Sequence, residues 1–381
     1  MTSHRITRIT LTDYRNYAAL RLDPPPGLIA LAGANGAGKT NLLEAISLLT
    51  PGRGLRSAEY QTIGRNDGQG AWAVSAVTAS HRGETQLGTA WTVSEEEGPN
   101  ASRAVLVDGH LQKSSGALAG FLRSVWLTPA LDRLFSGPAS ERRRYLDRMV
   151  ALFDNEHGAR INRYEKLMRE RNLLLSDGPL DRAWATSLEM QMAEEAVAIA
   201  AARLQAVSNL GAYLTPDRLS GPFPWSQLSI AGEIEDMVAT LPALQAEERY
   251  RQHLHDGRMA DKGAGRTLVG THRSDLVVRH GPKAIAAEEG STGEQKALLI
   301  GLILAQTEAI RAVTGSAPVL LLDEIAAHLD KSRRTALFSH LQSLNVQAWM
   351  TGTEAELFDG AGPSAMVYHV ENGTLNESIS D

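Results

Sequence analysis

A glycine-rich segment near the N-terminus constrains the fold of this chain more than any other feature. It reads Gly33-Ala34-Asn35-Gly36-Ala37-Gly38-Lys39-Thr40. It matches the phosphate-binding loop pattern G-x-x-x-x-G-K-[ST] at every fixed position. An apolar run over 27–32 predicts a buried strand before the loop, and 41–49 predicts a helix after it. This order of elements aims backbone N–H groups and a helix N-terminus at a phosphate chain. We therefore expect all eight residues to bind ATP, with Lys39 on the β- and γ-phosphates and the Thr40 hydroxyl on Mg²⁺.

A second motif is an apolar strand that ends in two carboxylates, Val319–Leu322 followed by Asp323 and Glu324. In phosphate-loop ATPases such a pair holds Mg²⁺ and activates water. Asp323 is predicted to hold the metal, directly or through water, and Glu324 to polarise the attacking water. The alternative is a buried strand whose following turn merely opens with acidic residues. Together with the loop, the pair predicts ATP hydrolysis with Lys39 and Glu324 as catalytic residues.

A third motif, residues 290–296, precedes a strongly apolar helix predicted over 296–313. Taken locally, Ser291 and Glu294 match a helix capping box. The segment also lies one helix before the Asp323-Glu324 strand, where ATP-binding-cassette (ABC) ATPases carry their signature. There a serine hydroxyl, a glycine N–H and a helix N-terminus bind the γ-phosphate held by the opposite subunit. We expect this role for a set of four residues: Ser291, Gly293, Glu294 and Gln295.

Two smaller elements fit the same class. The segment Ala327-His328-Leu329-Asp330 follows the acidic pair, where a loop crosses the dimer interface, so Asp330 is predicted at that interface. Thr351 follows a strand predicted over 346–350, where transporters usually place a histidine. A threonine hydrogen-bonds a γ-phosphate or its water but does not act as a base. Thr351 is therefore predicted to be a γ-phosphate sensor.

The remaining pattern predicts two additions to the nucleotide-binding core. Alternating residues over about 65–112, with the hairpin signal Asp108-Gly109, predict an antiparallel β layer. From 140 to 260 apolar residues recur at three- and four-residue spacing, which predicts helices. The expected fold class is therefore α/β, with a nucleotide-binding head formed by 1–139 and 261–381 and an inserted helical domain over 140–260.

Composition excludes several other functions. The chain has no cysteine, which removes disulfides, thiolate metal sites and cysteine nucleophiles. Its N-terminus is polar, and no apolar run approaches the ~20 residues of a bilayer span. We therefore expect a cytoplasmic protein with no membrane partner. The net charge of −6 means that any nucleic-acid surface must be local.

Several segments outside the general ATPase motifs are distinctive. They are Asp13-Tyr14-Arg15-Asn16-Tyr17, Gly137-Pro138, Arg142-Arg143-Arg144-Tyr145-Leu146-Asp147 and Gly270-Thr271-His272-Arg273-Ser274-Asp275-Leu276. With the loop, the signature and the acidic pair, they resemble the RecF family of bacterial recombination-repair ATPases, in the superfamily of Rad50 and SMC heads. Two departures stand out. Ser274 replaces a usual aspartate, and Pro129-Ala130-Leu131-Asp132 departs from Pro-Glu-Asp-Leu, which leaves open the residue that senses the attacking water.

The resemblance implies an ABC-type ATPase head that dimerises with a second copy of itself on ATP and binds double-stranded DNA and single-strand/duplex gap junctions. It also implies slow ATP hydrolysis, work with RecR and RecO, recombinase loading, fork restart and the SOS response. Arg15 and Asn16 are implied to touch the nucleotide. Candidates for DNA phosphate contacts are Arg53, Arg56, Arg142, Arg143 and Arg144. For the run 142–144, a solvated helix face paired with Glu141 and Asp147 is an equal alternative.

Two other function classes remain open from the sequence. One is the nucleotide-binding subunit of a transporter, which the long stretch between Lys39 and Ser291 and the threonine at 351 disfavour. The other is a non-catalytic scaffold that binds ATP only to dimerise, which Glu324 disfavours.

Overall fold

A computed structural model of the chain describes residues 4–80, 83–92, 103–177, 179–219, 221–326 and 329–377. The chain divides into two compact units, Met1–Leu131 with Thr307–Asp381, and Asp132–Gln306. The second unit is wider than the helical insert predicted over 140–260, because it also takes in the segment with the predicted signature. The predicted domain boundaries therefore stay a prediction.

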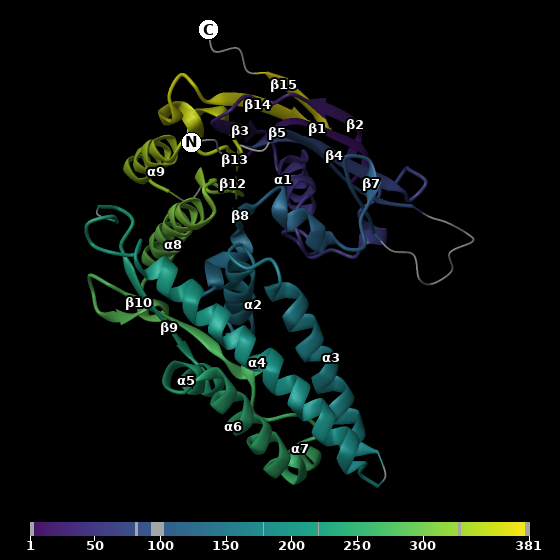
Figure 1. Cartoon of the computed structure of the whole chain (residues 1–381). Helices are drawn as coiled ribbons and strands as arrows, with labels where there is room; N and C mark the ends of the chain where they lie inside the picture. The colour runs from purple at the N-terminus through teal and green to yellow at the C-terminus, as the bar shows by residue number, and fades with distance from the viewer. Residues whose placement is uncertain are drawn as a thin grey trace. The chain divides into compact units, whose positions relative to one another are not determined.

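The first unit contains a mostly parallel sheet in the order β15-β14-β3-β13-β12-β8 (Figure 1). Its strands are β3 (Leu28–Ala32), β8 (Ser124–Leu127), β12 (Val319–Leu322), β13 (Ala348–Gly352), β14 (Met366–Glu371) and β15 (Thr374–Glu377). Only the edge strand β15 pairs antiparallel, with β14. Strands β3, β12 and β13 are buried at every residue, as expected of apolar strands covered on both faces. The buried strands predicted over 27–32 and 319–322 are confirmed.

A second sheet of the same unit is antiparallel, in the order β2-β1-β4-β5-β6-β7. Its strands are β1 (Arg5–Tyr14), β2 (Tyr17–Leu22), β4 (Trp72–Ser80), β5 (Gly83–Trp91), β6 (Ala104–Val107) and β7 (His110–Leu111). The β layer predicted over about 65–112 is confirmed for its described residues, and the first two strands of the chain belong to it as well. Helix α1 (Lys39–Leu48) contacts both sheets. Its apolar residues join a core that both sheets share, which fixes the helix behind the phosphate-binding loop.

The last α-helix in the described part of this unit is α9 (Lys331–Leu344). It begins at Asp330, whose carboxylate accepts a hydrogen bond from the backbone N–H of Arg333 at 2.8 Å. Such an N-cap satisfies one of the free donors of the first helical turn.

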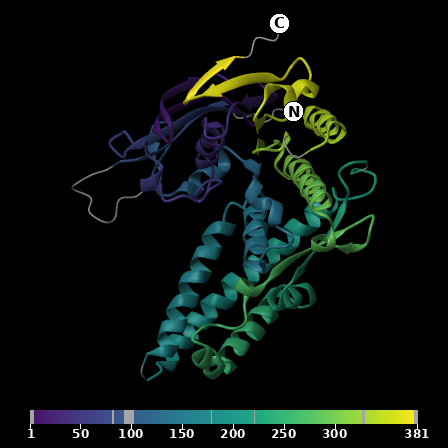
Figure 2. The same ribbon diagram turned by 180° about the vertical axis from the view of Figure 1, so that it is seen from behind.

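The second unit is mainly helical (Figure 2). Its helices are α2 (Ala139–Val150), α3 (His157–Ser176), α4 (Arg182–Gly211), α5 (Glu233–Thr240), α6 (Ala243–Asp256) and α7 (Arg258–Ala264). Helix α4 packs on α3 and α6, and its buried face is rich in alanine, as at Ala196 and Ala200. Pro242 separates α5 from α6, because proline cannot continue a helix from the preceding turn. The predicted helical pattern is confirmed.

A small antiparallel sheet, β11-β10-β9, completes the second unit. It consists of β9 (Ser226–Ala231), β10 (Asp275–His280) and β11 (Ile285–Ala286). Strand β10 lies within the range 261–381 that was predicted for the nucleotide-binding head, but it pairs with β9 in the second unit. The sequence carries no strong signal for β9, because this strand is short and partly exposed between two helices.

Helix α8 (Thr292–Thr314) is a long apolar helix. Among the described residues it is the one helix that is long and apolar enough to cross a membrane. This contradicts the expectation that no apolar run approaches that length. Because 72% of its most apolar stretch is buried inside the fold, the helix is explained as a core helix.

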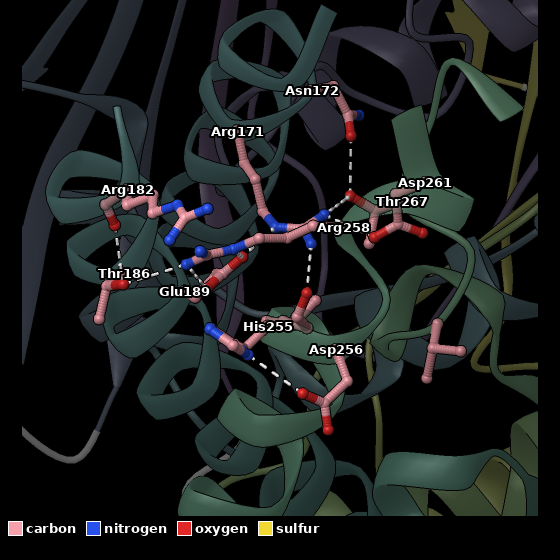
Figure 3. A network of polar contacts seen from close by, with 12 residues as sticks. Arg171, Asn172, Arg182, Thr186, Glu189, His255, Asp256, Arg258, Asp261 and Thr267 are labelled. Carbon is pink, nitrogen blue, oxygen red and sulfur yellow. Dashed lines mark hydrogen bonds and ion pairs between the residues drawn. The ribbon is translucent and has the colours of Figure 1, made fainter. Parts of the chain in front are cut away.

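A buried ion-pair network ties three helices of the second unit together (Figure 3). Arg171 of α3 has no exposed surface. Its guanidinium donates to Glu189 of α4 at 3.0 Å and to Asp261 of α7 at 2.7 Å. Arg258 donates to the same Glu189 carboxylate at 2.6 Å. The two arginines thus balance two carboxylates away from water, where any unpaired charge is costly.

We predict that Arg171→Met lowers the free energy of unfolding by about 3 kcal/mol, because Glu189 and Asp261 lose a buried partner. Urea denaturation measures this. The control is Arg169→Met on the same helix, whose side chain is 66% exposed and which should change stability by no more than about 0.5 kcal/mol. Equal effects of the two substitutions would contradict the assignment.

Candidate nucleotide-binding site

The phosphate-binding loop leaves β3 and enters α1 with two glycines in crowded places. A side chain on Gly33 (φ +153°) would place its Cβ 2.3 Å from the carbonyl oxygen of Val370 in β14. A Cβ on Gly38 (φ +118°) would lie 2.5 Å from the Asn16 side chain. Only glycine fits both the backbone angles and the close approach. The rest of the fold therefore fixes the shape of the loop.

Lys39 lies across the inside of this loop. Its Nζ donates to the carbonyl oxygens of Gly33 at 2.6 Å and Ala34 at 2.9 Å. Burial lowers the pKa of Lys39, while Glu324 and Asp323 act to raise it. A cavity of about 240 Å³ opens beside the ammonium, lined by Asn35, Gly36, Gly38, Lys39, Thr40, Asn41, Arg56 and Glu324. A concave site with backbone donors and a lysine suits a phosphate chain.

Asp323 lies beneath the loop and receives two hydroxyl groups. Thr40 Oγ1 and Thr351 Oγ1 each donate to Asp323 Oδ1 at 2.8 Å. The strand order brings these three residues together. Thr351 lies in β13, which is the neighbour of both β3, before the loop, and β12, before Asp323. The carboxyl ends of all three parallel strands meet at the same edge of the sheet, where open α/β sheets bind ligands.

Glu324 follows directly in a left-handed backbone conformation, with φ +53°. Its backbone N–H donates to Thr351 Oγ1 at 2.7 Å. The Thr351 hydroxyl is fully buried and engaged with both acidic residues. In this structure it orients Asp323 and Glu324, and its predicted contact with a γ-phosphate stays a prediction.

The oxygen set around Asp323 fits a magnesium ion. Mg²⁺ binds hydroxyl and carboxylate oxygens and usually keeps water and substrate phosphates as its remaining ligands. Thr40 and Asp323 provide one oxygen of each kind in contact with one another. In the described parts of the chain, no group of three or more His, Cys, Asp or Glu side chains could hold a metal by itself. A metal here would therefore share its coordination with the nucleotide.

The β1–β2 hairpin carries the predicted pair Arg15 and Asn16. Asn16 Nδ2 donates to the carbonyl oxygen of Ala37 in the loop at 2.8 Å. Arg15 donates twice to the Glu44 carboxylate of α1, at 2.8 Å each, and lines an open pocket beside the loop. Arg15 has φ +54°, and such strained backbone is common at functional sites. The structure thus brings both residues to the phosphate-binding loop.

Arg56 lies at the cavity of the phosphate-binding loop, although the sequence predicted it only as a contact for DNA phosphates. Its Nη1 donates to Asn41 Oδ1 at 2.8 Å and lies 3.4 Å from Glu44. It lines the same cavity as Lys39. Its position in a loop shortly after α1 is a weak signal, because only the folded loop turns it back to the cavity. Arg53 is exposed, as Arg56 is, but its guanidinium lies over the Tyr60 ring.

The arginine run of α2 is mostly engaged within the second unit. Arg142 donates twice to the Asp275 carboxylate, at 2.8 and 2.7 Å. Arg143 donates to the carbonyl oxygen of Ser274 at 2.9 Å, whereas Arg144 is exposed. The segments 142–147 and 270–276 therefore bind each other. This differs from both alternatives for Arg142 and Arg143, a DNA contact and a solvated helix face.

The predicted signature lies at the start of α8. Ser291 and Gly293 are exposed, and Gln295 Nε2 donates to the carbonyl oxygen of Gly290 at 2.8 Å. Glu294 accepts hydrogen bonds from both the backbone N–H and the hydroxyl of Ser291, at 2.9 and 3.0 Å. In return, the backbone N–H of Glu294 donates to Ser291 Oγ at 3.4 Å. The capping box expected from the local sequence is thus present.

Two further predicted elements flank these motifs. Asp330 is exposed at the N-terminus of α9, while Ala327 and His328 of the same predicted loop lie outside the described residues. In the segment that departs from the Pro-Glu-Asp-Leu pattern, Asp132 binds Lys296 of α8 at 3.1 Å.

Known proteins resemble this chain along nearly its whole length. A family model described as the RecF/RecN/SMC N terminal domain matches residues 5–376. A DNA replication and repair protein RecF of Mesorhizobium japonicum is 52% identical over 372 residues, 97% of both chains. A second RecF, of Rhizobium meliloti, is 46% identical over 371 residues, covering 97% of this chain and 98% of the relative.

Solved structures show the same fold. The recombination mediator protein RecF with ATPrS, described in the RecFOR pathway, has a TM-score of 0.85 at 22% identity and covers 98% of each chain. An SMC head domain of Pyrococcus furiosus, bound to the C-terminal domain of ScpA, has a TM-score of 0.54 at 14% identity and covers 98% of this chain and 96% of that one. The predicted fold class, an ABC-ATPase head resembling SMC heads, is confirmed.

We predict that Thr351→Val reduces ATP hydrolysis by about ten-fold or more, because Asp323 and Glu324 lose the hydroxyl that orients them. Steady-state release of phosphate at saturating Mg²⁺ and ATP measures this. Thr351→Ser is the matched control, since it keeps the hydroxyl and should retain most of the activity. Equal losses in both variants would show that packing of the side chain, rather than the hydroxyl, matters.

Proposed function

Because this chain belongs to the RecF family of the RecF/RecN/SMC group, we propose that it is an ATP-dependent DNA-binding protein of DNA replication and recombinational repair. The observation that carries the proposal is the contact of Thr40 with Asp323 beneath a complete phosphate-binding loop, with Glu324 beside it. This set of groups suits binding and hydrolysis of a nucleoside triphosphate. Family membership favours a role on DNA over that of a transporter subunit.

The chemistry follows from the chain's own residues. The Lys39 ammonium would exchange the carbonyl oxygens of Gly33 and Ala34 for the phosphates, which are stronger acceptors. Thr40 and Asp323 would hold Mg²⁺, which when bound neutralises charge on the phosphates. Glu324 would accept a proton from the attacking water. We propose that ATP turnover is slow and depends on DNA. Hydrolysis would then act as a switch that ends the ATP-bound state of the protein.

We propose that the ATP-bound state is a dimer of this chain. The support is that Ser291 and Gly293 stand exposed at a helix N-terminus, which favours binding of a phosphate from outside the protomer. The γ-phosphate bound by one copy would then contact the signature of the other, with Asp330 at the interface. ATP binding and closure of the dimer would be one event.

On this basis we propose that the closed dimer binds duplex DNA and single-strand/duplex gap junctions in the cytoplasm. RecR and RecO are the proposed partners, and recombinase loading, fork restart and the SOS response the proposed processes. Because the net charge is −6, DNA contacts would be few and local, with exposed Arg53 and Arg144 as first candidates. Affinity should then fall only gently with salt.

We predict that ATP strengthens binding to duplex DNA about ten-fold, as expected for coupled binding sites, and that Lys39→Met removes this effect. The cause is that without the ammonium the loop no longer holds the phosphates. Gel-shift titrations with and without ATP measure both affinities. Equal DNA affinity of the unmodified protein with and without ATP would exclude an ATP-controlled DNA clamp.

We predict that Glu324→Gln slows hydrolysis about a hundred-fold or more, because a general base is lost, and that it accumulates an ATP-bound dimer. Light scattering at saturating ATP gives the mass, with the Lys39→Met protein as a monomeric control. A Glu324→Gln protein that binds ATP yet remains monomeric would refute the two-copy site.

A further inference from the structure

A tight turn between β10 and β11 presents Lys283 next to the signature segment. In this turn the Ala284 backbone N–H donates to the His280 carbonyl oxygen at 2.8 Å. Arg279 Nη2 donates to the Ala284 carbonyl oxygen at 2.6 Å. Gly281 packs against Trp225 so closely that a Cβ there would lie 2.3 Å from the indole ring. The turn is therefore held from several sides, and the position of Lys283 is set by the backbone.

Lys283 reaches the signature through Glu294. Its Nζ forms an ion pair with Glu294 Oε1, while Glu294 Oε2 accepts from the hydroxyl of Ser291 at 3.0 Å. Hydrogen bonds from Lys283 and Ser291 lower the pKa of Glu294 to about 2. A glutamate is charged at neutral pH in any case, so a carboxylate anion accepts the hydroxyl of Ser291, the group expected to meet a phosphate.

This arrangement creates an electrostatic conflict for phosphate binding. Glu294 belongs to the predicted signature set, but its carboxylate side chain cannot donate to a phosphate. A triphosphate arriving at Ser291 would therefore meet a like charge at Glu294, and Glu288 and Glu289 are exposed just before it in the chain. Like charges brought together at an interface oppose association. The other lysine at the start of α8, Lys296, is already paired with Asp132. Lys283, with a side chain 50% exposed, is thus the cation placed to offset Glu294.

We propose that Lys283 is a positioning residue of the two-copy ATP site, which neutralises Glu294 and draws it away from the Ser291 hydroxyl when the partner's triphosphate arrives. This inference rests on the proposed function, because it needs the signature of one copy to meet the nucleotide of another. It assigns to a hairpin outside the ATPase motifs a role in closing the dimer. If the pair only capped α8, Lys283 would affect the stability of the helix and nothing else.

The test measures dimerisation in the Glu324→Gln protein at saturating ATP by light scattering across protein concentrations. Adding Lys283→Met should raise the dimer dissociation constant about ten-fold, because Glu294 then faces the triphosphate without its cation. Adding Glu294→Gln as well should restore dimerisation, because the opposing charge is gone. Lys262→Met, at an exposed lysine of α7, is the matched control and should leave the constant unchanged.

Two further measurements separate this role from a structural one. Binding of a fluorescent ATP analogue to the monomer and the thermal unfolding temperature should be the same with and without Lys283→Met. If Lys283→Met weakens dimerisation but Glu294→Gln does not restore it, or if Lys283→Met has no effect, the inference is overturned while the two-copy site stands. If the Glu324→Gln parent itself stays monomeric in ATP, the proposed function fails and this inference fails with it.

Discussion

The contact of two threonine hydroxyls with one carboxylate oxygen of Asp323 organises the nucleotide-binding unit. Thr40 brings in the phosphate-binding loop and α1, and Thr351 brings in the middle strand of the sheet. Each hydroxyl has a single proton, and both are donated to the same acceptor. The fold itself therefore holds the loop, the Asp323 carboxylate and Glu324 as one constellation, and such preorganisation reduces the reorganisation needed for catalysis.

Sequence reasoning predicted the elements whose geometry is local. The loop at 33–40 and the strand before Asp323 were recognised because a short pattern sets their backbone shape. The role of Thr351 as the orienter of two acidic residues was not visible, because it depends on the order of strands in the sheet. Arg56 was predicted only as a DNA contact, and its place in the cavity beside Lys39 was missed for a similar reason, since only the folded loop returns it there.

In the helical unit, the segments that resemble the RecF family form ion pairs with each other and with neighbouring helices. Arg142 and Asp275 belong to two of the segments that resemble the RecF family, and they pair with each other in the fold. Arg203, from a helix without any recognised motif, binds Asp147 of the first segment. An arginine run in a sequence does not reveal whether its partners are phosphates or carboxylates, because the pairing spans distant parts of the chain. The structure leaves Arg144 as the exposed member of the run.

Glu324 combines the carboxylate that we propose as the proton acceptor with a left-handed backbone shape that disfavours any side chain. A left-handed conformation costs a non-glycine residue roughly 1–2 kcal/mol, and here φ is +53°. Glycine would relax the backbone but remove the proposed proton acceptor, so on our proposal stability and activity make opposite demands on this position. The hydrogen bond from its N–H to Thr351 offsets part of the cost. Selection for a more stable head would therefore favour variants that no longer hydrolyse ATP. A chain that keeps glutamate at this position gives up some stability for turnover.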